Sequence, residues 1–444
     1  MPRASAKWSA VVREAGLGCT LMPMPRSLLT VLLISATLAA VALIPGSLRT
    51  SVTEPIRIGV FHAASGPMAE SEKGLVDAAR LAVEEINAEG GLLGRRVDLV
   101  VAENDSDWAT AAAEVERLIL EERVSVVLAC WTSACRKAVK PVVEEHRHLM
   151  LYALQYEGME QSSHLVYMGS APNQQIIPGA RWTMDRFGSR IYLVGSDYVF
   201  PRTANRLIRD LVTAAGGEIL AERYVPMDAT DLDAIAAEIR RLAPDAVLNT
   251  LNGNANRHLF ASLLAANLDA MPVVSFSVAE PELRSMHSGR LHREHYAVWG
   301  YFQSLPDAVN RRFVAAFRQR FGADRVVSDP IVSSYNGIKL WAEAVREAGT
   351  DDPAQVNRSI GRASLHGPSG IVTLDAATRH LWRRVYVGHA RADGQFDAVE
   401  ISEAPVRPAP FPAHRSRAQW RALVDLLSDE SDRRPPEDSQ QWAQ

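Results

Sequence analysis

The chain has 444 residues, of which 47% are hydrophobic and 23% are charged. This length exceeds that of one average domain, and the apolar content is sufficient for a sizeable soluble core, so we expect two lobes and exclude wholesale disorder. The formal net charge of −4 gives no electrostatic case for nucleic-acid binding, which needs a concentrated basic face.

The first element in chain order is an uncharged apolar run at residues 27–44, "SLLTVLLISATLAAVALI". It follows Arg26, and Ala40 to Ala42 provide a small-x-small cleavage site, which is typical of a secretory signal. The run is also long enough to remain in the bilayer as an anchor. We expect residues 1–50 to be a cleaved signal peptide, with an uncleaved N-terminal anchor as the alternative. Either one predicts a periplasmic protein, and only an uncleaved run would associate it with the membrane, through residues 27–44.

From residue 55 onward, short β-branched runs alternate with amphipathic stretches. This alternation is typical of a mostly parallel sheet with helices on both faces. It starts again at about residue 172, so two similar α/β units account for the chain up to about residue 300. Strands are predicted at 56–61, 96–102, 124–130, 149–154, 191–195, 245–250 and 272–277, and helices at 74–89, 109–122, 135–146, 173–187, 203–217, 231–242 and 254–268.

The segment after residue 300 does not predict a third unit of this kind. Helical patterns at 307–322 and 331–349 are followed by short strands at 370–375 and 383–396. We interpret these elements as pieces that return to the two lobes, which requires several chain crossings and a hinge. The chain at 405–444 is rich in proline and charge, so we expect a surface-draped or disordered tail, with one or two helical turns in "AQWRALVDLL".

The sequence contains three cysteines. Cys19 precedes the apolar run and therefore cannot be the lipid-modified cysteine of a lipoprotein. Cys130 and Cys135 could pair in an oxidising compartment. However, Cys130 ends a predicted strand and Cys135 begins a predicted helix, so we interpret both as unpaired small apolar residues.

Signatures of common enzyme classes are missing from the sequence. It has no G-x-x-x-x-G-K-[ST], no G-x-G-x-x-G after a strand and no G-x-S-x-G. Ser196 ends a predicted strand as a hydrolase nucleophile would, but no spacing supplies its base, and a turn serine explains it equally well. We therefore predict no enzyme activity, no cofactor and no metal. Standard metal-ligand spacing is lacking for the clustered histidines, His146, His148, His287, His292 and His295.

Aromatic and hydroxyl side chains follow several predicted strands, at the ends where open α/β sheets bind ligands. Aromatic walls exclude water, and hydroxyls with a glutamine amide supply both donors and acceptors, which suits a small neutral polar ligand with an amide or urea group. The nearest arginines, Arg136 and Arg202, lie a turn into helices, so an anionic ligand is less natural. The candidate ligand-binding residues are Ser65, Trp131, Thr132, Ser133, Tyr152, Gln155, Tyr156 and Tyr198.

The segment "PIRIGVFHAASGPMAESEKGLVDAARLAVEEINAEGGLLGRR" resembles the opening of type I periplasmic substrate-binding proteins of the branched-chain amino acid family. Further motifs, "ACWTSACRKAVKPVVEEH", "QYEGMEQSSHLVYMGSAPNQQIIPG" and "YLVGSDYVFPRTAN", are similar to the branch that binds urea or short-chain aliphatic amides. The similarity implies α/β architecture with two Rossmann-like lobes of mostly parallel sheets, joined by a three-strand hinge. The implied lobes are 54–171 with 303–355 and 172–302 with 356–404.

Proteins of that branch hold the amide between the lobes with aromatics and a hydroxyl. The positions that match them here are Trp131, Ser133, Tyr152 and Tyr198. The chain departs from the urea-type pattern at Ala153 and Leu154, where that pattern contains a proline, and at Cys135, where it has a serine. The amide-sensor relatives have a tyrosine at the position of Trp131. Trp131 and Gln155 therefore favour urea, and the Ala153–Leu154 change leaves the pocket size open.

These observations together predict an exported binding protein that closes its lobes on urea or a short-chain amide and presents it to an ABC permease in the inner membrane. Two alternatives stay open. One is an amide or urea sensor of the same fold that controls a regulatory partner. The other is an amidase-like hydrolase that uses Ser196.

Overall fold

The computed structural model describes residues 54–63, 65–66, 68–104, 109–286 and 292–433. The chain divides into two units, Met1–Thr53 and Glu54–Gln444, and the fold below is that of the second unit. The apolar run at 27–44 and Cys19 lie outside the described residues. Within the described ranges, no helix combines the length and the apolar character that crossing a membrane requires.

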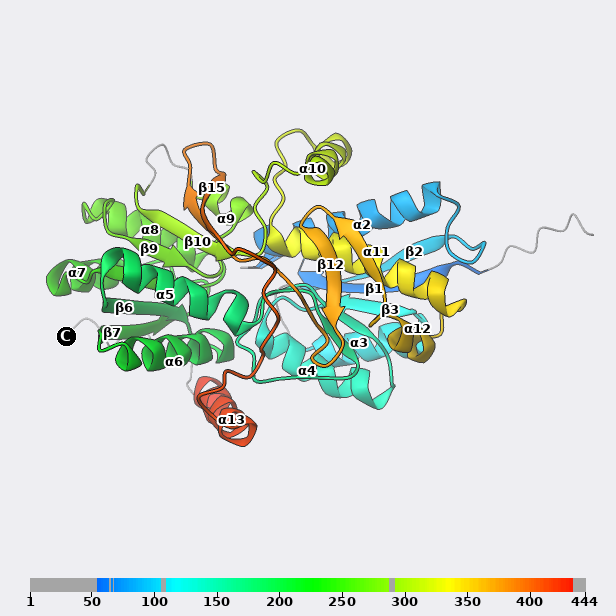
Figure 1. Ribbon diagram of the computed structural model, residues 1–444, viewed down its shortest axis with the longest axis horizontal. Coiled ribbons are helices and arrows are strands. Elements are labelled where there is room, and N and C mark those ends of the chain that lie inside the picture. Colours follow the sequence, from blue (N-terminus) through cyan, green and yellow to red (C-terminus); the bar gives the residue numbers. More distant parts are fainter. Residues whose placement is uncertain (1–53, 64, 67, 105–108, 287–291, 434–444) are drawn as a thin grey trace, which may run out of the picture. The chain divides into compact units, whose positions relative to one another are not determined.

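The N-terminal lobe is built on a sheet that has eight strands among the described residues. Its first five strands are parallel to one another and to β13, whereas β11, β12 and β13 pair antiparallel among themselves. Figure 1 shows β12, in orange, in the same lobe as the blue and cyan strands. In order across the sheet, the strands are β11 (Ser364–Gly367), β12 (Gly370–Asp375), β13 (His380–Leu381), β5 (Leu165–Tyr167), β4 (Met150–Tyr152), β3 (Val126–Ala129), β1 (Ile56–Ala63) and β2 (Val97–Asn104).

Helices cover both faces of this sheet, and the central strands are therefore buried on both sides. All four residues of β3 and seven of the eight residues of β1 are buried, which explains their continuous β-branched and apolar sequence. The helices of this lobe are α2 (Ala69–Ala88), α3 (Ala111–Leu120), α4 (Ser133–Glu145), α10 (Ala308–Phe321), α11 (Asp329–Ala348) and α12 (Pro353–Ser359).

The C-terminal lobe repeats this arrangement on a sheet of seven described strands. Five strands are parallel, and β14 and β15 add to one edge in antiparallel orientation. Across the sheet these are β15 (Phe396–Ile401), β14 (Tyr386–Ala390), β10 (His295–Trp299), β9 (Val273–Ser275), β8 (Ala246–Thr250), β6 (Arg190–Ser196) and β7 (Glu218–Val225). A 3₁₀ turn, η2 (Pro172–Gln174), enters the lobe, and its helices are α5 (Ile176–Phe187), α6 (Val199–Ala214), α7 (Asp233–Leu242), α8 (Ala255–Ala265) and α9 (Glu280–Ser285).

The described chain passes between the two sheets three times, at about 168–175, 300–307 and 382–385. The predicted fold class, two α/β lobes with mostly parallel sheets, is confirmed. The lobe boundary after residue 355 differs from the prediction, because β11, β12 and β13 join the N-terminal sheet rather than the C-terminal one. A short strand pattern predicts extended backbone but not its partner, and the partner is set here by the pairing of His380 with Tyr167.

The tail expected to be surface-draped or disordered at 405–444 is regular over much of its described part. Helix α13 spans Arg417–Arg433 and lies against α6. Ahead of it, the Arg407 guanidinium pairs with the Asp375 carboxylate of β12 at 2.8 Å. Trp420 of α13 is fully buried in the apolar core of the C-terminal lobe. Composition did not predict this packing, because it does not show which side chains of the segment become buried against the lobe.

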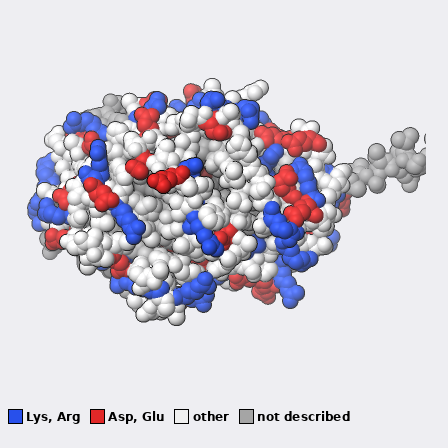
Figure 2. Space-filling model, in the orientation of Figure 1, with Lys and Arg blue, Asp and Glu red and all other residues white. Residues whose placement is uncertain are grey.

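Charged side chains do not gather into a region of one sign on the face shown in Figure 2, where basic and acidic residues are intermingled. This agrees with the small net charge of the sequence.

Candidate functional site

The junction between β3 and α4 forms one wall of the candidate site. Thr132 precedes α4 as its N-cap, in extended conformation, and its hydroxyl accepts a hydrogen bond from the Cys135 backbone N–H at 3.2 Å. Cys130 and Cys135 form a disulfide across this turn, so the prediction that they are unpaired is wrong. Capping folds the first helical turn back over the end of the strand, which leaves the two Cα atoms 5.5 Å apart, within the range a disulfide spans.

A buried ion network lies behind this wall. The Arg136 guanidinium is completely buried, and it donates to Ser133 Oγ at 2.9 Å, to Glu157 Oε1 at 3.0 Å and to Glu160 Oε1 at 2.9 Å. Ser133 Oγ also donates a short hydrogen bond to Glu157. Lys137 Nζ lies 4.0 Å from Glu157 and 3.6 Å from Glu160, so two cations face two carboxylates. The charges of the network are therefore compensated within the protein.

The electrostatics of the network follow from burial and from these pairs. Burial raises the pKa of Glu160, but the positive charges of Arg136 and Lys137 outweigh it and lower that pKa to about 2. Burial lowers the pKa of Arg136, yet the two carboxylates hold it well above its usual value. Glu160 and Arg136 are consequently both charged at neutral pH.

Aromatic rings enclose the Arg136 side chain. Its guanidinium carbon lies 4.8 Å from the Tyr152 ring centroid and 4.6 Å from that of Tyr156, in the range of cation–π contact. The Tyr152 hydroxyl donates to the Trp131 carbonyl at 2.8 Å, and the Tyr156 hydroxyl donates to the Glu160 carbonyl at 3.0 Å. Burial raises the pKa of Tyr152 to about 12, so it remains a neutral donor.

Tyr198 contributes to the site from the C-terminal lobe, at the end of β6. Its side chain is 8% exposed. Burial raises the pKa of Tyr198 well above the usual value; Tyr152 and Glu157 raise this pKa further, and the positive charge of Arg136 opposes the rise. Among the described residues, its hydroxyl has no hydrogen-bond partner.

Hydrogen bonds cross between the two lobes at the same edge of the sheets. Trp131 Nε1 donates to Asn252 Oδ1 at 3.3 Å. Gln155 Nε2 donates to the Phe276 carbonyl and to Ser277 Oγ, each at 3.2 Å. The Gln155 Oε1 atom is buried and, within the described part of the chain, has no hydrogen-bond partner. The site thus contains an unused buried acceptor from one lobe and an unused phenol from the other.

The structure brings most of the predicted residues together. Trp131, Ser133, Tyr152, Gln155 and Tyr156 are all buried within the network or directly beside it. Two predicted residues do not join it in this way. Ser65 is exposed on the loop between β1 and α2, and the Thr132 hydroxyl is occupied by its capping bond.

Sequence reasoning missed Arg136, Glu160 and Asn252 as members of the site. Arg136 follows Ser133 by three residues, a spacing that places both on one face of a helix, so this signal was present in the sequence. Glu160 and Asn252 offered no comparable signal, because their partners are distant in sequence.

The arrangement around Ser196 does not resemble a nucleophile with its base. Ser196 Oγ is buried, accepts the Asn252 backbone N–H at 2.9 Å and donates to the Asn252 carbonyl at 3.5 Å. No histidine or carboxylate contacts this hydroxyl among the described residues. Its role in this geometry is to fix the loop after β8.

Comparisons with known proteins agree with this architecture. Similar solved structures include a solute-binding protein of an ABC transporter from R. palustris in complex with 4-hydroxybenzoate, with a TM-score of 0.71, 21% identity, and coverage of 80% of this chain and 98% of that one. Another is a branched-chain amino acid transporter substrate-binding protein from Streptococcus pneumoniae in complex with isoleucine, with a TM-score of 0.69, 20% identity, and coverage of 79% and 99%. These likenesses show the fold.

Curated relatives divide into a long match and a short one. The Leu/Ile/Val-binding protein homolog 6 of Brucella abortus (strain 2308) is 23% identical over 371 residues, which cover 80% of this chain and 93% of the relative. A limonene hydroxylase of Geobacillus stearothermophilus is 32% identical over 143 residues, 31% of this chain, and this match spans about a quarter (26%) of the hydroxylase. A family model described as a periplasmic binding protein domain matches residues 56–417. The chain therefore belongs to the periplasmic binding protein family.

Proposed function

We propose that the chain is an extracytoplasmic solute-binding protein that captures urea or a short-chain aliphatic amide between its lobes and delivers it to an ABC permease in the inner membrane. Binding of this kind leaves the ligand unchanged, so the proposal involves no catalysis. Relatives of the same fold are named for other ligands, isoleucine and 4-hydroxybenzoate among them. The choice of ligand class for this chain rests on the charges of its own site.

The observation that carries the proposal is the compensation of Arg136. Its Nε, Nη1 and Nη2 atoms all donate to protein acceptors, and two of the three bonds go to carboxylates. A ligand carboxylate bound here would lie beside the Glu157 carboxylate. No unpaired positive charge of the described residues would be present there to neutralise it. Burying such a charge is costly, so amino acids and benzoates are disfavoured relative to neutral ligands.

The unused polar atoms fit a neutral amide or urea. Gln155 Oε1 accepts hydrogen bonds, and the Tyr198 hydroxyl can donate one. An amide supplies the N–H donors and the carbonyl acceptor that these two atoms need. Ligand-mediated bonds to both lobes exist in full only when the lobes are closed, which links binding to closure.

The disulfide and the N-terminal run support an extracytoplasmic location. Structural disulfides persist in oxidising compartments such as the bacterial periplasm, and Cys130 and Cys135 are paired beside the site. Export itself depends on residues 27–44, which lie outside the described part of the chain.

Isothermal titration calorimetry of residues 46–444 tests the proposal, with urea, acetamide, leucine and 4-hydroxybenzoate as ligands. We expect saturable heat with urea or acetamide and none with the two carboxylates. Heat with leucine or 4-hydroxybenzoate alone would overturn the assignment of ligand class. Uptake of the labelled ligand by cells lacking the gene then separates transport from sensing, because a sensor would leave the uptake system itself intact.

A further inference from the structure

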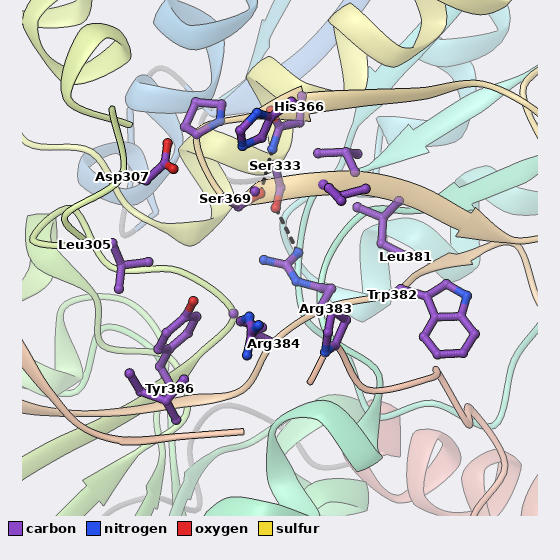
Figure 3. Close-up of a pocket in the computed structure, with 18 of the residues that line it drawn as sticks. Leu305, Asp307, Ser333, His366, Ser369, Leu381, Trp382, Arg383, Arg384 and Tyr386 are labelled. Atoms are coloured by element: carbon purple, nitrogen blue, oxygen red, sulfur yellow. Dashed lines mark hydrogen bonds between the residues drawn. The ribbon is translucent and has the colours of Figure 1, made fainter. Parts of the chain in front are cut away.

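A cavity of about 660 Å³ lies away from the candidate site, against the segments that connect the lobes. Its wall comes from the second crossing at 300–307, the third crossing at 382–385 with the flanking residues Leu381 and Tyr386, the hairpin of β11 and β12, and the start of the tail. The candidate ligand-binding residues are not among its lining residues (Figure 3). Its volume falls in the range of small-molecule sites in proteins.

Much of the wall is apolar. Leu305, Val372 and Leu381 line the cavity, together with Ile371 and Ile401. The Ile371 side chain is 73% exposed and that of Ile401 is 48% exposed. Large aliphatic side chains exposed together around one cavity gain free energy when an apolar body covers them.

One positive charge of the wall has no carboxylate partner in the described part of the chain. Arg384 Nη1 donates only to the backbone carbonyls of Ser402, at 2.8 Å, and Glu403, at 3.1 Å. Its Nε and Nη2 atoms, an adjacent pair of N–H donors, have no partner among the described residues. These two donors match the geometry of the two oxygens of a planar carboxylate.

The phenol of Tyr386 lies beside this charge. Tyr386 and Arg384 both line the cavity, and burial raises the pKa of Tyr386 while the positive charges of Arg384 and Arg383 oppose the rise. In Figure 3, Arg384 lies between Tyr386 and Arg383. The Tyr386 hydroxyl has no hydrogen-bond partner within the described residues, so it is a second available donor.

The other charged groups of the wall are already engaged or lie at its edge. Arg383 forms a short ion pair with the buried Asp329 carboxylate. Asp307 caps α10 by accepting the backbone N–H groups of Val309 and Asn310. His366 is exposed at the rim. Arg384 is therefore the lining cation that remains without an acidic partner in the part of the chain that the structure describes.

We propose that this cavity is a second ligand site, which binds a small monocarboxylic acid with an apolar body. The carboxylate is held by Arg384 Nε and Nη2 and by the Tyr386 hydroxyl, and the apolar body lies against Leu305, Ile371 and Val372. The chemistry is opposite to that of the candidate site, where the buried cation is compensated and the proposed ligand is neutral.

Calorimetric titration with hexanoate tests the proposal, with 1-hexanol as the matched neutral probe. We expect 1:1 binding of hexanoate with a Kd below about 1 mM and markedly weaker binding of 1-hexanol. Arg384→Gln should weaken hexanoate at least tenfold, and Tyr386→Phe, which removes only the hydroxyl, should weaken it severalfold. Arg96→Gln is the control for the loss of one positive charge, because Arg96 is exposed and does not line the cavity, and it should leave binding unchanged.

Three results would overturn the second site: no hexanoate binding, binding that both Arg384→Gln and Tyr386→Phe leave intact, or binding that Trp131→Ala abolishes. The last would place hexanoate in the candidate site instead. Titration of Arg384→Gln with urea and acetamide separates this proposal from the proposed function, since that variant should keep their affinity. If the wild type binds neither urea nor acetamide, the proposed function is refuted. The hexanoate titration still decides whether the second site exists.

Discussion

Arg136 and Arg384 both lie near tyrosine rings, but their surroundings differ in the one respect that decides ligand charge. Arg136 is completely buried and donates to Ser133, Glu157 and Glu160. Arg384 lines an open cavity and donates only to backbone carbonyls. An arginine beside a cavity therefore does not by itself indicate an anionic ligand. What matters is whether its donors and its charge are already satisfied.

The largest expected effect is on stability. Replacing Arg136 with Met should lower the free energy of unfolding by about 3–5 kcal/mol, because Glu157 and Glu160 would remain buried without their guanidinium partner. Arg384→Gln should change it by less than about 0.5 kcal/mol, since no acidic partner is lost. Equilibrium denaturation measures the change in unfolding free energy of both variants. Guanidinium chloride is the denaturant, because urea is itself a candidate ligand. Equal effects of the two substitutions would remove the contrast between the two arginines.

Acid should weaken the compensated network in a defined window. The pKa of Glu160 is lowered from 4.5 to about 2 in the folded protein. Its contribution to stability is thus fully present above its unfolded pKa and is lost as the pH falls through the folded value. Thermal unfolding from about pH 6 to about pH 2.5 should show the difference between wild type and Glu160→Gln shrinking as the pH falls. A difference that does not change with pH would show that the carboxylate is not held by the network.

Ligand affinity should depend on the aromatic wall of the candidate site. Trp131→Ala should weaken urea or acetamide binding more than tenfold, because one well-packed aromatic contributes roughly 1.5 kcal/mol or more. Trp182, a partly buried residue of α5, gives the control Trp182→Ala, which should leave the affinity unchanged. An unaltered affinity in Trp131→Ala would assign that side chain to the core.

The smallest and most specific effect is a change of preference. In Glu157→Gln, two cations, Arg136 and Lys137, face one carboxylate, Glu160, so the network gains one positive charge. We expect the affinity for acetate to rise relative to that for acetamide, a ligand of nearly the same shape, by about tenfold. Calorimetry with both ligands measures the ratio. An unchanged ratio would show that Glu157 does not set ligand charge.

The parts of this molecule that follow from local patterns were predictable from sequence. Alternating β-branched and amphipathic runs predicted the two α/β units. The ends of the predicted strands indicated where candidate ligand-binding side chains lie, among them Trp131, Ser133, Tyr152 and Tyr198. Membership of β11 to β13 in the N-terminal sheet was not predictable, because strand pairing over such distances leaves no local signal.

Long-range partners explain the remaining differences. The two carboxylate acceptors of Arg136 lie 21 and 24 residues away in sequence, and Asn252 lies 121 residues from Trp131. The disulfide joins the two ends of the turn before α4, and the tail is held by contacts with distant segments, among them the burial of Trp420 and the ion pair of Arg407 with Asp375. None of these is a feature of composition or periodicity.

The most direct test of the central claim is the affinity of the wild-type protein for acetamide or urea compared with acetate. A site whose buried cation is compensated should bind the neutral ligand much more tightly than acetate. Acetate binding as tight as that of acetamide or urea, or tighter, would show that Arg136 is available to an anion and would contradict the account.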